Sequence, residues 1–326
     1  MKPTLRPGLL PLWRDKDTVQ IGIDPRRAVA ISGMSGAAEL IRLLDGSRDR
    51  DQLIAEASRC GVPTAVSERV IGVLAAAGAI VDFPSEILRS IQPELRRQLM
   101  PVLTTASVAA QDGDGGASIL ARRSSCTVQV RGYGPIAALV GDLLTRSGLA
   151  AAGPASGPRA SPADLLVLVG RPSLDESTEL LRSHQPYLAV YAGEAIGVVG
   201  PLVRPGVTAC LRCIDLAKAE RDPAWPLILA QLAGRSADPS GCDEILATSV
   251  AAQAAAQAVA FADRSQLPQA TVNATLELVL PSWQWRRRSW LPHPACICGS
   301  TARSMITQDL PRHGTEDPTS RLVRPD

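Results

Sequence analysis

Histidine and net charge are both scarce in this chain of 326 residues. Only 3 histidines are present, and no cysteine–histidine constellation typical of a thiol nucleophile is visible. The 34 basic residues nearly balance the 32 acidic ones, which leaves a net charge of +2 and no large field to attract nucleic acid or anionic lipid. We therefore expect neither a nucleic-acid partner nor a membrane partner.

Long hydrophobic runs are also missing. Residues 1–7 lack the apolar stretch of a signal peptide, and no run of about 18 apolar residues is available for a membrane helix. We therefore expect a cytoplasmic protein. Because 45% of the residues are hydrophobic, the chain can bury a sizeable core, and its length predicts about two domains.

Four of the seven cysteines form two short-spaced pairs, Cys210 with Cys213 and Cys296 with Cys298. In a reducing compartment such pairs indicate metal ligands rather than disulfides. Four thiolates suit zinc, which they bind tetrahedrally, and a site with four protein ligands leaves no position for substrate. We predict one structural zinc ion that ties the end of the chain to the core. The alternative is two unrelated pairs of buried cysteines.

The other cysteines, Cys60, Cys126 and Cys242, are expected to be small buried side chains. His293 precedes the second pair. Since four sulfurs already complete a zinc site, we expect it beside the site or at the surface rather than on the metal.

Residues 1–82 predict a unit of their own. Three short apolar runs, at 9–13, 19–23 and 28–31, are separated by turn-forming residues and predict an antiparallel meander. Apolar positions at helical spacing then predict three helices between 38 and 74. Together they predict a winged-helix-like element of three strands plus three helices.

The middle of the chain changes composition. Residues 83–100 have helical periodicity, whereas 101–125 are rich in Ala, Gly, Ser and Asp and are interpreted as the interdomain connection. We assign 83–125 to a helix and linker. The charged, Pro- and Thr-rich segment 300–326 is expected to be a disordered tail.

Residues 126–299 predict an open α/β sheet. It begins with a strand at 127–130, a helix at 136–147 and a strand at 165–169. Later segments predict a hairpin at 187–199, helices at 213–218 and 245–261, and a final antiparallel pair formed by 271–280 and 283–290.

A glycine turn follows the first of these strands. Gly132, Gly134 and Ala137 fit the GxGxxA form of the nucleotide fingerprint, in which glycines let the backbone approach a phosphate at a helix N-terminus. The acidic residue expected about 20 positions later is missing, since 149–161 contains no Asp or Glu. A tight turn kept for packing is the competing interpretation.

The glycine turn, the segment 200–213 and the closing cysteine pair together resemble the ThiF family of ubiquitin-activating-type proteins. They look most like its cyclodehydratase-associated branch, which serves the biosynthesis of azole- and azoline-containing peptides, and the motif Asp222–Pro226 suits that branch. The likeness covers about 126–299 and implies a Rossmann-like ThiF-type α/β domain.

Residues 5–82 resemble the PqqD-like element that recognises leader peptides, with Leu43–Gly46 and Leu74–Ile80 carrying the likeness. The resemblance implies that a leader adds as a fourth strand beside the third strand and lies against the third helix, by β-augmentation. The implied peptide-contact residues are Arg27, Ala28, Val29, Ala30, Ile31, Val66, Arg69, Val70 and Val73.

The chain departs from the adenylating members of the family. Only about fourteen residues separate Gly148 from Ala163, too few for the ribose and phosphate contacts of those enzymes, and no aspartate ends the strand at 165–169. Adenylyl transfer needs metal and cationic groups. We expect zinc but not ATP as a cofactor, and no catalytic residue in this chain.

The favoured function is therefore a scaffold that binds a precursor's leader peptide and presents it to a separate YcaO-type cyclodehydratase. One alternative is an adenylating enzyme that uses Arg131, Arg159 and Arg171 as phosphate contacts. Another is a DNA-binding module, although residues 1–82 carry 11 basic and 10 acidic side chains, which is poor for phosphate binding. A homodimer stays open.

Overall fold

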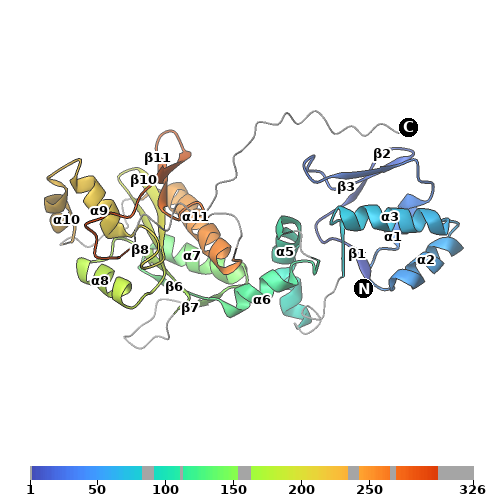
Figure 1. Ribbon diagram of the computed structural model, residues 1–326, viewed down its shortest axis with the longest axis horizontal. Coiled ribbons are helices and arrows are strands. Elements are labelled where there is room, and N and C mark those ends of the chain that lie inside the picture. The colour runs from blue at the N-terminus through green and yellow to red at the C-terminus, as the bar shows by residue number, and fades with distance from the viewer. Residues whose placement is uncertain are drawn as a thin grey trace.

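The computed structural model describes residues 2–82, 92–110, 113–152, 163–233, 242–264 and 269–299. Two folded parts lie along the long axis of the molecule, with helices α5 and α6 between them (Figure 1). The predicted tail, 300–326, lies outside the described residues.

The N-terminal part contains the three strands and three helices that the sequence predicted. The strands form an antiparallel sheet in the order β2-β3-β4, with bounds β2 (Pro11–Asp15), β3 (Thr18–Ile21) and β4 (Val29–Ser32). The helices are α1 (Ala37–Arg42), α2 (Arg50–Arg59) and α3 (Thr64–Ala76). A further antiparallel pair, β1 (Pro3–Leu5) with β5 (Ile80–Asp82), was not predicted, because its strands are far apart in the sequence.

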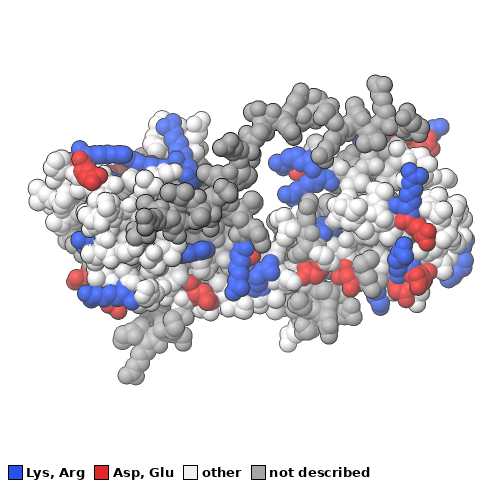
Figure 2. All heavy atoms as spheres, in the orientation of Figure 1, with Lys and Arg blue, Asp and Glu red and all other residues white. Residues whose placement is uncertain are grey.

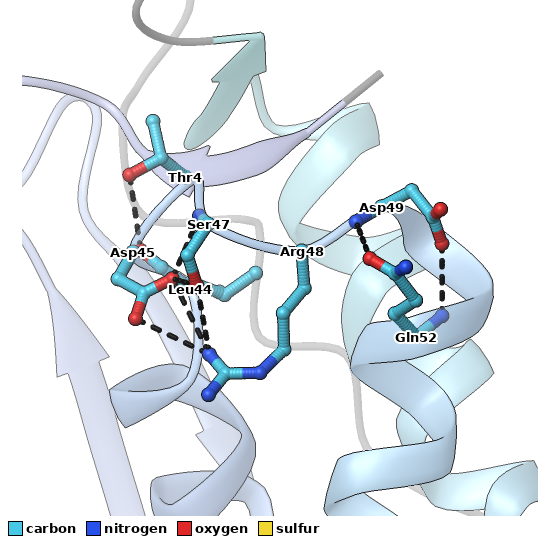
Figure 3. Close-up of polar contacts among 7 residues, drawn as sticks. All are labelled: Thr4, Leu44, Asp45, Ser47, Arg48, Asp49 and Gln52. Atoms are coloured by element: carbon cyan, nitrogen blue, oxygen red, sulfur yellow. Dashed lines mark hydrogen bonds and ion pairs between the residues drawn. The ribbon is translucent and has the colours of Figure 1, made fainter.

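A polar network fixes the connection between α1 and α2 (Figure 3). The Thr4 hydroxyl donates to the carbonyl of Leu44 at 3.0 Å, which links β1 to the end of α1. The Asp45 carboxylate accepts from the backbone N–H of Ser47 at 2.9 Å and pairs with Arg48 at 3.2 Å. The hydrogen bonds from Ser47 are the main reason that the pKa of Asp45 is lowered.

Helix α2 begins with a capping box. The Asp49 carboxylate accepts from the N–H of Gln52, and the Gln52 side chain accepts from the N–H of Asp49 (Figure 3). The box satisfies two donors at the helix start and lets α2 pack Leu53 into the core shared with Ile31 and Val70.

The connection between the two parts is largely helical. Helices α5 (Pro93–Ala110) and α6 (Ala117–Ser125) occupy most of the stretch where composition predicted the interdomain connection. Buried Arg6 donates to the carbonyl of Ser107 at 2.6 Å and so holds α5 to the N-terminal part. Arg123 pairs with Asp263 at 2.7 Å and holds α6 to the other part.

A seven-stranded mixed sheet organises the second part, in the order β12-β11-β10-β9-β8-β6-β7. The parallel strands are β6 (Thr127–Arg131), β7 (Ala150–Ala152), β8 (Leu165–Val169) and β9 (Tyr187–Gly193). The antiparallel extension is β10 (Ile196–Val203), β11 (Ala274–Val279) and β12 (Gln284–Ser289). The predicted β-α-β unit, hairpin and final pair are therefore confirmed.

Helices cover both faces of this sheet (Figure 1). Helices α7 (Pro135–Arg146) and α11 (Glu244–Ala262) pack on one face around buried Val167, and α8 (Leu174–Arg182) and α9 (Leu211–Ala219) pack on the other around Leu166. Helix α11 is long and apolar enough to cross a membrane by length and composition, but it supplies much of the core under the sheet.

Three elements of this part were not predicted: β7, α8 and α10 (Trp225–Ala233). Strand β7 is only three residues long. Helix α8 carried signals that could have revealed it, because Ser173 caps its start and Leu180 and Leu181 lie on its apolar face. Helix α10 is apolar almost throughout, so its period is hidden.

Candidate functional site

Four cysteine sulfurs lie together where the start of α9 meets the segment that follows β12. Cys210 Sγ is 3.7 Å from Cys213 Sγ and 3.6 Å from Cys296 Sγ, and Cys213 Sγ is 3.5 Å from Cys298 Sγ. A disulfide would need about 2.05 Å. Zinc bound tetrahedrally at about 2.3 Å would separate its sulfurs by about 3.8 Å. The four predicted ligands are therefore brought together in a set that fits a metal such as zinc.

The backbone around the first pair is held by a residue that sequence reasoning missed. The side-chain oxygen of Asn273 accepts from the N–H of Ala209 at 2.7 Å. The backbone carbonyl of Asn273 accepts from the N–H of Trp290 at 2.8 Å. Asn273 thus aligns the chain just before Cys210 with the chain leading to Cys296. Its position in the sequence, 64 residues from Ala209, gives no signal of this role.

The electrostatics of the cluster also favour a cation. A hydrogen bond from the Cys210 thiol lowers the pKa of Cys213 to about 5, whereas burial raises the pKa of Cys296 to about 12. The same bond raises the pKa of Cys210. Cys213 is therefore the thiol that ionises most readily, and a bound cation would offset the burial and mutual repulsion that keep Cys210 and Cys296 protonated.

The other cysteines differ in exposure. Cys60 is exposed, which corrects the expectation that it is buried, because it caps the end of α2 at the surface. Cys126 and Cys242 are half-buried, and burial raises the pKa of each thiol. The His293 ring lies 2.9 Å from Glu220, so its Nε2 has a partner other than the sulfur cluster.

The glycine turn lies at the point where an open α/β sheet binds ligands. Strands β7 and β8 flank β6 on opposite sides, which makes the end of β6 a topological switch point. Gly132 follows β6 with φ +128°, and a Cβ there would overlap the carbonyl oxygen of Val169. Gly134 precedes α7, and Ala137 packs against the core. Close packing between β6 and β8 therefore requires Gly132 whether or not a nucleotide binds.

Two of the three arginines considered as phosphate contacts have carboxylate partners. Arg131 pairs with Glu176 at 2.8 Å, and Arg171 pairs with Asp215. Arg159 lies outside the described residues. The two arginines that can be placed would have to exchange an ion pair for a phosphate.

Strand β4 forms one edge of the three-stranded sheet. Among the residues that the structure describes, β4 pairs only with β3, so its second edge has no strand beside it. Of the predicted peptide-contact residues on this strand, Ala30 is exposed, Val29 is half-buried and Ile31 is buried. Just before it, Ala28 is half-buried, and the exposed Arg27 donates to the carbonyl of Val108 at 2.8 Å.

The predicted contacts on α3 divide in the same way. Arg69 and Val73 are exposed, Val66 is half-buried, and Val70 is buried in the core with Ile31. Of the predicted contacts on α3, Val66, Arg69 and Val73 are therefore accessible to a peptide, whereas Val70 is not.

Comparisons with known proteins match the fold. No protein-family model matches the sequence, and no curated protein does. The structure is similar to that of the heterocyclase TruD, with a TM-score of 0.65 and 17% identity over 92% of this chain and 43% of that one. A heterocyclase in complex with substrate and cofactor matches with a TM-score of 0.66 and 14% identity, over 92% of this chain and 39% of that one.

MccB of E. coli, bound to AMPCPP and MccA, matches over its full length. Its TM-score is 0.63 and its identity 14%, over 92% of this chain and 100% of that one. The predicted resemblance is thus confirmed at the level of the fold, which this chain shares with the heterocyclases and with MccB. This chain spans less than half the length of the two heterocyclases it matches.

Proposed function

We propose that this protein is a cytoplasmic scaffold that binds the leader of a ribosomal precursor peptide and presents it to a separate YcaO-type, ATP-dependent cyclodehydratase. Residues 1–82 are the winged-helix-like recognition element, and residues 126–299 form a Rossmann-like domain with one structural zinc ion. The observation that carries the proposal is the open edge of β4, which has no charged side chain between Val29 and Ser32.

An extended peptide fits this edge through its backbone. Its N–H and C=O groups would pair with those of β4, and its side chains would contact Val66, Arg69 and Val73 on α3. The matched fold gives further support, because MccB has been captured with the peptide MccA, and one matched heterocyclase with its substrate.

The backbone contact can be tested with methylated peptides. A labelled leader from a precursor encoded by the source organism is titrated into the full chain, with single amide N–H groups methylated in turn. In a strand added to β4, only alternate N–H groups pair, so methylation should weaken binding roughly fivefold at alternate positions, from about 1 kcal/mol per bond. An effect without a period of two would contradict strand addition.

The helix contact has a matched control. Val73→Glu should weaken leader binding at least tenfold, because it places a charge on the side of α3 that meets the peptide. Val207→Glu alters an exposed valine outside this part and should leave binding unchanged. Equal affinities of the two variants for the leader would mean that the peptide does not contact α3.

Adenylation is the second candidate, because the glycine turn lies at the switch point and MccB, of similar fold, is known with ATP. It predicts micromolar binding of ATP with magnesium and ATP–pyrophosphate exchange in the presence of the precursor. The scaffold predicts neither. Precursor-dependent pyrophosphate exchange by the purified wild-type chain would replace the scaffold by the enzyme.

A further inference from the structure

Helix α10 has an unusual surface for its position. Its nine residues include no charged side chain, yet Leu227, Ile228 and Leu232 are 65%, 38% and 47% exposed. A helix that is apolar on all sides is normally buried. Here the apolar face is open to solvent. At the end of the molecule where α10 lies, Figure 2 shows charged side chains above and below an outermost surface that is mostly uncharged.

The helix is held firmly in this position. The Trp225 ring N–H donates to the Asp215 carboxylate at 3.2 Å, and the Lys218 ammonium lies 4.4 Å from the centre of the ring. The Asp222 carboxylate accepts from the N–H of Ala224 at 3.0 Å, just before the helix begins. Asp215 and Lys218 belong to α9, so α10 is anchored to the helix that starts at the cysteine cluster. Its apolar side chains are presented on a fixed support.

The lengths of the two matched heterocyclases guide the choice of partner for this face. The same fold occupies only 43% and 39% of the two heterocyclase chains, so more than half of each is further chain joined covalently to it. In the proposed function, the cyclodehydratase activity belongs to a separate protein and not to further chain of this one. A non-covalent interface must then replace the covalent connection, and a charge-free, immobilised helix face suits a folded apolar partner.

We propose that Leu227, Ile228 and Leu232 of α10 dock the separate cyclodehydratase through an apolar patch on that protein. The inference rests on the proposed function. Helix α10 and the N-terminal sheet lie at opposite ends of the long axis (Figure 1), so docking leaves the edge of β4 free for the leader. The protein, the cyclodehydratase and the leader therefore form a ternary complex.

The test uses the full chain and the purified YcaO-type cyclodehydratase of the source organism. Leu232→Arg should weaken their association at least tenfold in calorimetry and leave the affinity for the leader peptide unchanged. Leu95→Arg is the matched control, because Leu95 is a helical leucine that is 48% exposed, on α5. It should bind like the wild type. If Leu232→Arg loses its zinc or its circular dichroism spectrum, Leu227→Arg takes its place.

The outcomes separate the two proposals. Equal affinity of wild type and Leu232→Arg for the cyclodehydratase overturns the docking face and leaves the scaffold in place. A wild type that binds no cyclodehydratase, or a source genome without one, overturns both. A wild-type dimer that Leu232→Arg converts to a monomer, with cyclodehydratase affinity unchanged, assigns the face to a second copy and also overturns the inference.

Discussion

Two edge strands of this molecule are built in opposite ways. Strand β4 ends the three-stranded sheet with Val29 to Ser32, none of them charged. Strand β12 ends the seven-stranded sheet and carries Arg286, Arg287 and Arg288 in succession. Charges on an edge strand discourage another strand from pairing with it. The comparison suggests that β12 is protected against added strands, whereas β4 can accept one.

The edges also differ in what holds them. Strand β4 is supported by local packing, through Ile31 in the N-terminal core. Strand β12 is followed by buried Trp290, whose ring N–H donates to Thr275 at 3.0 Å, and then by the second cysteine pair. A metal at the cysteine cluster would fix the segment from Trp290 to Cys298, which follows β12, to the start of α9. The two edges should therefore respond differently to loss of the metal.

Removing a metal ligand should have the largest effect. Cys213→Ser should release the zinc and lower the free energy of unfolding of the second part by several kcal/mol, on the order expected for a structural zinc site. Hydrogen exchange should rise in α9, α10 and β12 and stay unchanged in β2–β4. Cys60→Ser, at an exposed cysteine outside the cluster, is the control. Equal protection of β12 with and without zinc would contradict the proposed role of the metal.

The same site sets an expected pH dependence. Bound zinc requires thiolates, so it holds the thiol pKa values in the folded state below their unfolded values. This stability is present at neutral pH and is lost as the pH falls and protons displace the metal. Zinc release on acidification should accompany unfolding of the second part before that of β2–β4.

Removing charge from the protected edge should have an intermediate effect. Arg286→Thr with Arg288→Thr leaves β12 without two of its charges and should produce concentration-dependent self-association in sedimentation velocity. The double variant Arg97→Thr with Arg146→Thr removes the same charge from exposed helix positions and should remain dispersed. If both variants associate alike, net charge and not edge protection is responsible.

Removing the cap of α2 should have the smallest effect. Asp49→Ala breaks the capping box and should lower the free energy of unfolding of the N-terminal part by about 1 kcal/mol. Hydrogen exchange in α2 and α3 as a function of denaturant concentration would measure this change. Asp51→Ala, two residues later in the first turn of the same helix, should cost less because that side chain does not cap. Leader binding should persist in both variants.

Local patterns predicted much of the fold, and long-range pairing explains most of what they missed. The meander, the β-α-β unit at Thr127–Val169 and the final strand pair follow from short periodic runs and turn residues, and each is present. The pairing of β1 with β5 joins segments from the two ends of the N-terminal part, so no local pattern reveals it. The helical connection was hidden by a composition typical of linkers.

The sequence by itself determined the ligand set of the candidate metal centre, because two pairs of cysteines at short spacing are typical of metal ligands. It also determined the glycine turn and the presence of an edge strand near Val29. Only the tertiary structure decided that Asn273 aligns both cysteine-bearing segments and that Ile31 and Val70 are buried in one core. Only the tertiary structure also reveals that the apolar side chains of α10 are exposed. Burial and alignment depend on neighbours distant in the chain, whereas ligand chemistry and turn geometry are properties of a few consecutive residues.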